Sequence, residues 1–200
     1  MAAREGITGR LDEISITFKD GWKGFTIAAN GAEPDGMGWP LEQCAYWLDG
    51  AIRLGLVLHD DALIAKIRAR LDPIVDGVNK ADFGVSFIYW KKDLKPMGFN
   101  GWAHSHLGRA LVALYQGTGD KTVLDALVKV YADYPVGADP DPLSAPACNP
   151  LCNLDAMLET YSYSGEGRIL ERALEAMALP SAVKTIEDWR HERLLPNHMV

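Results

Sequence analysis

The chain contains an internal repeat the size of a helical hairpin, and this repeat restricts its fold more than any other feature. Three acidic residues, Asp60, Asp120 and Glu166, each follow a short turn, at intervals of 60 and 46 residues. Apolar residues follow each of them after four positions and again seven positions later, which is the spacing of one face of an α-helix. These residues are Ile64, Leu124 and Leu170, and then Leu71, Tyr131 and Met177. The repeat therefore predicts that each acidic residue opens an amphipathic helix.

A second amphipathic helix precedes each turn. These helices are expected at residues 41–58, 106–115 and 154–161. Glycine in the turns supplies the left-handed conformation that ends a helix, and a Thr or an acidic residue beside it can cap the next one. We therefore predict an all-α fold of repeated antiparallel helical hairpins in one domain that covers residues 1–200. Only residues 84–90, Gly-Val-Ser-Phe-Ile-Tyr-Trp, have the composition of a strand.

Composition and charge exclude several classes of function. The chain is 48% hydrophobic and 24% charged, which is typical of a globular protein with one core. The net charge is -7, and the longest basic cluster is the pair Lys91 and Lys92, so neither nucleic acid nor an anionic membrane is an expected partner. No stretch approaches about 18 consecutive apolar residues, and we therefore expect no membrane span.

The cysteines and histidines show no metal or cofactor motif. Three cysteines, Cys44, Cys148 and Cys152, cannot form a complete disulfide framework, which favours free thiols and a cytoplasmic location. The spacing between Cys148 and Cys152 lacks a second ligand pair, and His191 and His198 lack the spacing of a metal-binding helix. The glycine-rich stretches lack the strand, loop and helix context of a nucleotide site. We therefore expect neither a metal nor a cofactor.

Residues suited to ligand binding gather at the predicted starts of the first helices. In stacked hairpins these helices run in the same direction, so their leading ends meet and form a mouth. A sugar needs aromatic faces under its C–H surface and fixed partners for its hydroxyls. The candidate substrate-binding residues are Trp39, Glu42, Trp102, His104, His106 and His198.

Each of these candidates also has a structural interpretation. A Trp at the head of a helix is more often a core residue than a sugar platform. Because His104 and His106 are two residues apart on a helix, one of them must face away from the other. Glu42 and Asp49 share a helix face and resemble a glycosidase carboxylate pair, but an ion pair between Asp49 and Arg53 explains Asp49 equally well.

Several segments resemble the opening of the beta-L-arabinofuranosidase-type proteins of glycoside hydrolase family 127. The segments are 6–13, 39–50, 58–66, 106–107 and 113–120, and their most specific parts are Tyr-Trp-Leu-Asp-Gly (46–50) and Thr-Gly-Asp (118–120). The resemblance implies an (α/α)6 barrel of six hairpins whose central cavity binds a terminal sugar residue. It also implies that His106 and His198 contact the sugar. The catalytic glutamate and cysteine of such proteins belong to later hairpins, so no catalytic residue is assigned in this chain.

The expected protein is therefore part of a glycosidase-like toroid with about three of six hairpins, either a fragment or a half-barrel. Its predicted ligand is a small sugar or the end of a glycan. An arc of three hairpins leaves apolar faces uncovered, so we also expect a homo-oligomer. The alternative is a non-catalytic helical-repeat scaffold that binds a protein or peptide on its concave face. An apolar concave face without polar groups would favour that alternative.

Overall fold

The structure is a computed structural model that describes residues 2–6, 8–10, 39–80, 101–134, 136, 149–180 and 182–183. Every regular element in these ranges is a helix, which confirms the predicted all-α class. The strand-like residues 84–90 lie outside the described ranges. None of the helices that the structure describes is long and apolar enough to cross a membrane.

Three helical hairpins make up most of the described chain. Their helices are α4 (Trp39–Leu58) and α5 (Asp61–Lys80), α6 (Gly101–Thr118) and α7 (Lys121–Ala132), and α9 (Leu154–Ser164) and α10 (Gly167–Ala178). Two four-residue helices accompany them, α1 (Ala2–Glu5) at the start and α8 (Asn149–Cys152) before α9. The repeated antiparallel hairpins of the prediction are thus present, and each first helix begins at or before its predicted residue.

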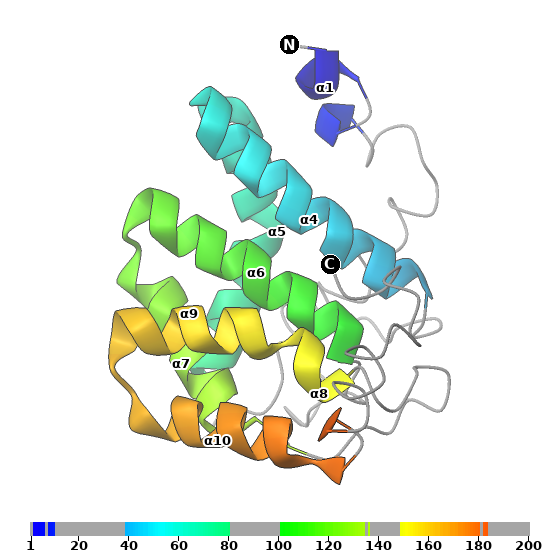
Figure 1. Ribbon diagram of the computed structural model, residues 1–200. Helices are drawn as coiled ribbons and strands as arrows, with labels where there is room; N and C mark the ends of the chain where they lie inside the picture. Colours follow the sequence, from blue (N-terminus) through cyan, green and yellow to red (C-terminus); the bar gives the residue numbers. More distant parts are fainter. Residues whose placement is uncertain are drawn as a thin grey trace.

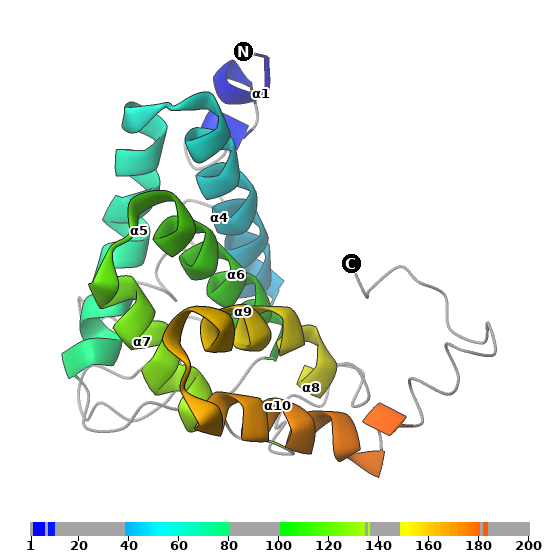
Figure 2. The same ribbon diagram turned by 60° about the vertical axis from the view of Figure 1, so that its left-hand side comes forward.

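The helices form two layers. Helix α6 packs between α4 and α9, and these first helices form one layer; α7 packs between α5 and α10 in the other (Figures 1 and 2). The three first helices begin at the same end of the molecule, and the three hairpin turns lie at the opposite end (Figure 1). This is the parallel arrangement expected of stacked hairpins, and it brings equivalent positions of the repeat next to one another.

The acidic residues of the repeat cap the second helix of each hairpin. The Asp60 carboxylate accepts a hydrogen bond from the backbone N–H of Leu63 at 3.0 Å. Asp120 does the same for Thr122 at 3.1 Å, and Glu166 for Arg168 at 3.2 Å. A capping carboxylate satisfies a backbone donor that has no partner within the helix. The prediction that these residues open α5, α7 and α10 is confirmed.

The turns use the left-handed backbone conformation that glycine favours. Gly119 and Gly165 have φ angles of +66° and +70°. In the first turn His59 takes the same conformation, with a φ of +52°, although its Cβ makes this costly. The glycine prediction is therefore confirmed for the second and third hairpins, while the first turn uses a non-glycine residue.

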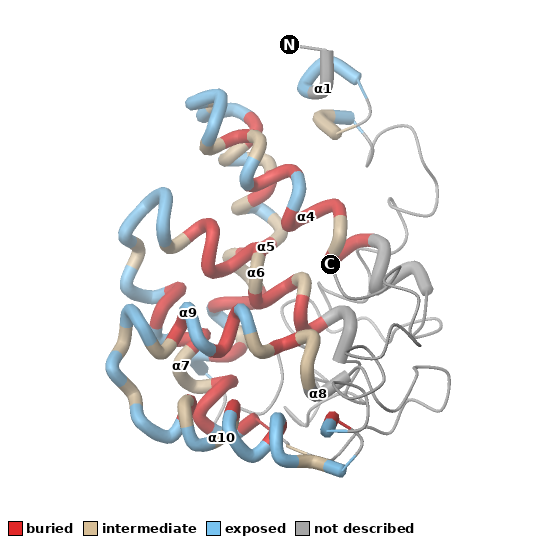
Figure 3. The backbone as a smooth tube through the Cα atoms, in the orientation of Figure 1, coloured by how far each residue is buried: buried red, intermediate tan, exposed pale blue. Residues whose placement is uncertain are grey.

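The hydrophobic core lies between the two layers (Figure 3). Residues at the same position of the repeat occupy equivalent places in it. In the first-helix layer these are Ala51, Leu111 and Met157, and in the second layer Leu63, Val123 and Ile169. All six are buried, since each has an exposed fraction of 5% or less. The repeat that appears in the sequence is therefore a repeat of core contacts.

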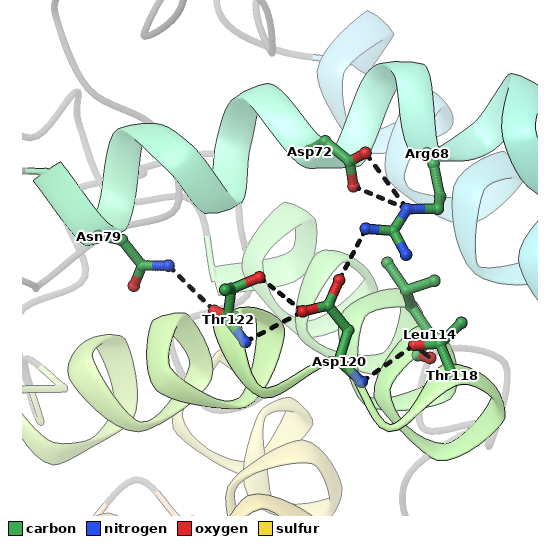
Figure 4. A network of polar contacts seen from close by, with 7 residues as sticks. All are labelled: Arg68, Asp72, Asn79, Leu114, Thr118, Asp120 and Thr122. Atoms are coloured by element: carbon green, nitrogen blue, oxygen red, sulfur yellow. Dashed lines mark hydrogen bonds and ion pairs between the residues drawn. The ribbon is translucent and has the colours of Figure 1, made fainter.

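A polar contact joins the first hairpin to the second (Figure 4). Arg68 of α5 donates to the capping carboxylate of Asp120 at 2.7 Å and to Asp72 on its own helix at 3.2 Å. Asn79, also on α5, donates to the carbonyl oxygen of Thr122 at 3.0 Å. The hydrogen bonds from Thr122 and from Arg68 hold the pKa of the Asp120 carboxyl below its usual value. The Asp120 side chain therefore caps α7 and also links the first hairpin to the second.

The N-terminal residues lie against the first hairpin. The Trp47 indole donates to the carbonyl oxygen of Thr8 at 2.7 Å, and the Lys66 ammonium donates to that of Gly9 at 2.9 Å. Arg4 forms an ion pair of 2.5 Å with Asp60, the cap of α5. This first end of the hairpin stack is thus covered by residues of the same chain.

Candidate functional site

Four of the six predicted sugar-binding residues remain predictions. Trp39 and Glu42 lie in the first turns of α4, and Trp102 lies in the first turn of α6, at the end where the first helices begin. The side chains of these three residues are outside the described part of the structure. His198 lies wholly outside the described residues.

The two histidines of α6 lie in different environments. His104 is fully buried, and this burial lowers the pKa of its imidazole to about 3, so the ring is neutral at pH 7. His106 is half-buried, and its ring meets that of Tyr46 edge-on, with 4.0 Å between the centroids. The spacing required one histidine to face away from the other. His104 is the buried one, and only His106 remains in our candidate site.

A row of charged side chains crosses the exposed side of the first-helix layer. Asp49 of α4 binds Arg109 of α6 at 3.1 Å, and Arg109 approaches Asp155 of α9 at 3.4 Å. These three residues occupy the same position of the repeat, at the same intervals of 60 and 46 residues. Arg53 adds a second ion pair to Asp49 at 2.6 Å, which confirms the expected pairing of Asp49 with Arg53.

Exposure increases along this row from one end to the other. The side chain of Asp49 is 10% exposed, that of Arg109 is 33% exposed and that of Asp155 is 52% exposed. Both oxygens of Asp49 are held by guanidinium groups, one from Arg53 and one from Arg109. Asp49 is therefore suited to fixing the planar guanidinium of Arg109, which can then offer paired donors to a ligand.

A second polar row lies nearer the turns. The Gln116 amide donates to the Glu159 carboxylate at 2.7 Å and to the Tyr163 hydroxyl at 3.0 Å. Tyr115 of α6 packs edge-on against Tyr163 of α9, with 5.2 Å between the ring centroids. Both rows link α6 to α9 through side chains that offer fixed donors and acceptors next to aromatic rings.

We call this surface the polar face. It consists of Tyr46, Asp49, Arg53, His106, Arg109, Gln116, Asp155, Glu159 and Tyr163. Most of these residues are absent from the predicted site, because that prediction concentrated on the helix starts. The repeat itself contains the missing signal: the intervals that align the three acidic caps also align Asp49 with Arg109 and Asp155.

The described cysteines do not extend this site. Cys44 is a buried thiol, the sulfur of Cys152 accepts a hydrogen bond from the Asn153 amide at 3.6 Å, and Cys148 lies outside the described residues. Burial raises the pKa of the Cys44 thiol to about 12, so it stays protonated and is a poor nucleophile. Within the described ranges, no group of three or more His, Cys, Asp or Glu side chains is placed to hold a metal ion.

The fold and the polar face together define an αα-hairpin repeat protein with a charged face on its first-helix layer. No protein-family model, curated protein or solved structure matches the chain.

Proposed function

We propose that the polar face binds a carbohydrate and that the chain is a sugar-binding part of a glycoside hydrolase-like helical barrel. The observation that carries this proposal is the row of Asp49, Arg109 and Asp155, in which ion pairs hold planar polar groups in fixed positions. Sugar hydroxyls need such pre-placed donors and acceptors, and the rings of Tyr46 and His106 add aromatic surface beside them. The resemblance to arabinofuranosidase-type proteins supports the same class of ligand.

The charged row also argues against the alternative function, a helical-repeat scaffold that binds a protein or peptide. A face that binds an apolar peptide should be lined by hydrophobic and aromatic anchors, with charged residues confined to its rim. Here Arg109 lies in the middle helix of the layer, between Asp49 and Asp155. A polar ligand with several hydroxyls fits this arrangement better than the apolar face of a peptide helix.

The proposal for these residues concerns binding and positioning of the sugar. A glycosidase acid must hold a proton that it can give to the leaving group. Both carboxylate oxygens of Asp49 are already engaged, one by Arg53 and the other by Arg109, so neither is directed at a leaving group. Its proposed role is therefore to orient Arg109, and the expected catalytic groups belong to the later hairpins that the resemblance implies.

Isothermal titration calorimetry with arabinose-containing oligosaccharides and plant cell-wall glycans tests this function. Arg109→Lys keeps the charge but removes the planar fork, and we expect it to weaken binding by about tenfold. Arg172→Lys is the matched control, because Arg172 makes a similar ion pair with Glu175 on the opposite layer. Trp102→Ala and His106→Ala report on the predicted mouth. Absence of binding to every glycan, or equal losses in the Arg109 and Arg172 variants, contradicts the proposal.

A further inference from the structure

The two rows of the polar face follow the same side of the first-helix layer, about two helical turns apart. Gln116 follows Arg109 by seven residues on α6, and Glu159 and Tyr163 follow Asp155 by four and eight residues on α9. Residues at these spacings share one side of a helix. With a rise of about 1.5 Å per residue, Gln116 lies about 10 Å beyond Arg109 along the helix axis. The rows are therefore two separate groups of polar side chains on one line of the surface.

The part of α6 between the two rows carries no charge. Residues 110–115 are all apolar or aromatic, and Ala113, four positions after Arg109, is 3% exposed. Arg53 of α4 and Glu159 of α9 occupy the same position of the repeat on either side of Ala113. A small apolar side chain flanked by polar ones suits a sugar, whose C–H surface packs on apolar groups while its hydroxyls bond to the polar ones.

The second polar row holds its groups in fixed positions, as the first row does. The Gln116 amide binds both the Glu159 carboxylate and the Tyr163 hydroxyl, and Tyr115 contacts the ring of Tyr163 edge-on. Tyr163 is nevertheless 45% exposed. Hydrogen bonds between exposed side chains replace bonds to water, so their net contribution to folding is small. Folding alone therefore does not explain this row.

The second row also offers hydrogen-bonding groups to a ligand. Because Gln116 donates to the Tyr163 hydroxyl, that hydroxyl can donate its own proton to a sugar oxygen. The Glu159 carboxylate has two oxygens, and Gln116 binds one of them. The exposed part of the Tyr163 ring supplies aromatic surface beside these groups.

We propose that the second polar row is a second sugar subsite and that the ligand is an oligosaccharide lying along α6, with one sugar unit on each row. This inference rests on the proposed function, because it assigns a length to the carbohydrate that the polar face binds. A monosaccharide is too short to contact Arg109 and Gln116 at once. A site for a single terminal sugar residue would need only the row that contains Arg109.

Isothermal titration calorimetry with arabinose, arabinobiose, arabinotriose and arabinotetraose tests this inference. The affinity of the wild type should rise about tenfold or more from the monosaccharide to the tetrasaccharide, because the longer chain reaches the second row. Tyr163→Ala removes the aromatic ring of that row. This variant should bind the tetrasaccharide about tenfold more weakly and arabinose as well as the wild type does.

Asn79→Ala is the matched control. Asn79 is also an exposed amide that joins two hairpins, through the carbonyl oxygen of Thr122 at 3.0 Å, but it belongs to α5 in the other layer. This variant should bind all four sugars like the wild type. Circular dichroism establishes that each variant is folded, and Gln116→Ala replaces Tyr163→Ala if the latter does not fold.

The possible results distinguish a failure of the second subsite from a failure of sugar binding. Affinity that does not rise with chain length overturns the second subsite but leaves the sugar-binding function in place. So does a loss in the Tyr163 variant that is equal for arabinose and arabinotetraose, or an equal loss in the Asn79 control. Absence of binding at every length removes the sugar-binding function and this inference with it.

Discussion

The first-helix layer has two sides, and the same repeat provides both of them with opposite chemistry. On the side that faces the second layer, Ala51, Leu111 and Met157 are fully buried at equivalent positions. The members of the charged row, Asp49, Arg109 and Asp155, each lie two residues before one of these buried residues. His104 and His106 show the same contrast on one helix, because one is in the core and the other is against Tyr46 at the surface.

The apolar side of the first-helix layer holds the fold together, whereas its charged side is available for ligand binding. Burial of apolar surface is the dominant favourable contribution to folding, and it comes from the inner side. Ion pairs that are partly open to water contribute little stability, so the charged row is not explained by folding alone. Substitutions on the two sides should therefore have very different effects on the free energy of unfolding.

Leu111→Ala should cause the largest loss. Leu111 is fully buried in the middle helix of the layer, and its truncation removes apolar contacts and leaves a cavity. We expect the free energy of unfolding in urea to fall by about 3 kcal/mol. Val57→Ala, on a side chain that is 77% exposed, should change it by less than about 0.5 kcal/mol. Equal effects would show that Leu111 does not lie in the core.

Acid should destabilise the protein through His104. Its pKa is about 3 in the folded chain and about 6.5 when unfolded, so the unfolded chain binds a proton that the folded chain excludes. This contribution is complete well above pH 6.5 and decreases as the pH falls toward 3, by about 2 kcal/mol at pH 5. In the His104→Leu variant, the midpoint of urea unfolding should change less with pH over this range. An unchanged pH profile in that variant would contradict the buried, neutral histidine.

Gly108→Ala should destabilise the packing between α6 and α7. A Cβ at this position collides with the hydroxyl of Tyr131, which is fully buried. Overpacking outweighs the gain in helix propensity, and we expect a net loss of about 1 kcal/mol. Tyr131→Phe removes the colliding oxygen, so Gly108→Ala should cost less in that background. Equal costs in both backgrounds would exclude the collision as the cause.

Asp49→Asn should have the smallest effect, because it acts on the exposed side. It keeps the size of the side chain but removes the charge that binds Arg53 and Arg109. We expect a loss of less than about 1 kcal/mol, since solvent screens both guanidinium groups. A double-mutant cycle with Arg109→Gln should give a coupling energy that decreases with added salt. A cost like that of Leu111→Ala would mean that the row is a structural core.

Much of the fold could be predicted because its signals are local. The acidic caps at Asp60, Asp120 and Glu166 and the glycines at positions 119 and 165 act within a few residues of themselves. Helix α6 was predicted to begin at His106, five residues later than it does. Its first turn, from Gly101 to Ser105, lacks apolar periodicity, yet His104 and Ser105 are buried by packing against the rest of the fold.

The candidate site was less predictable, because it depends on contacts between hairpins. The sequence required His104 and His106 to face apart, but it contained no indication of which one would be buried. The repeat intervals of 60 and 46 residues align the members of the charged row, but only the stacking of the hairpins brings these distant residues into contact.

The three helical hairpins, their capped turns and their apolar faces follow from the amino-acid pattern alone, because hydrogen bonding and helical periodicity act over a few residues. Hairpin stacking makes Asp49, Arg109 and Asp155 one row, and it buries His104 while His106 stays at the surface. The physical reason is that ion pairing and burial depend on which helix faces become neighbours. That choice is made when the hairpins stack.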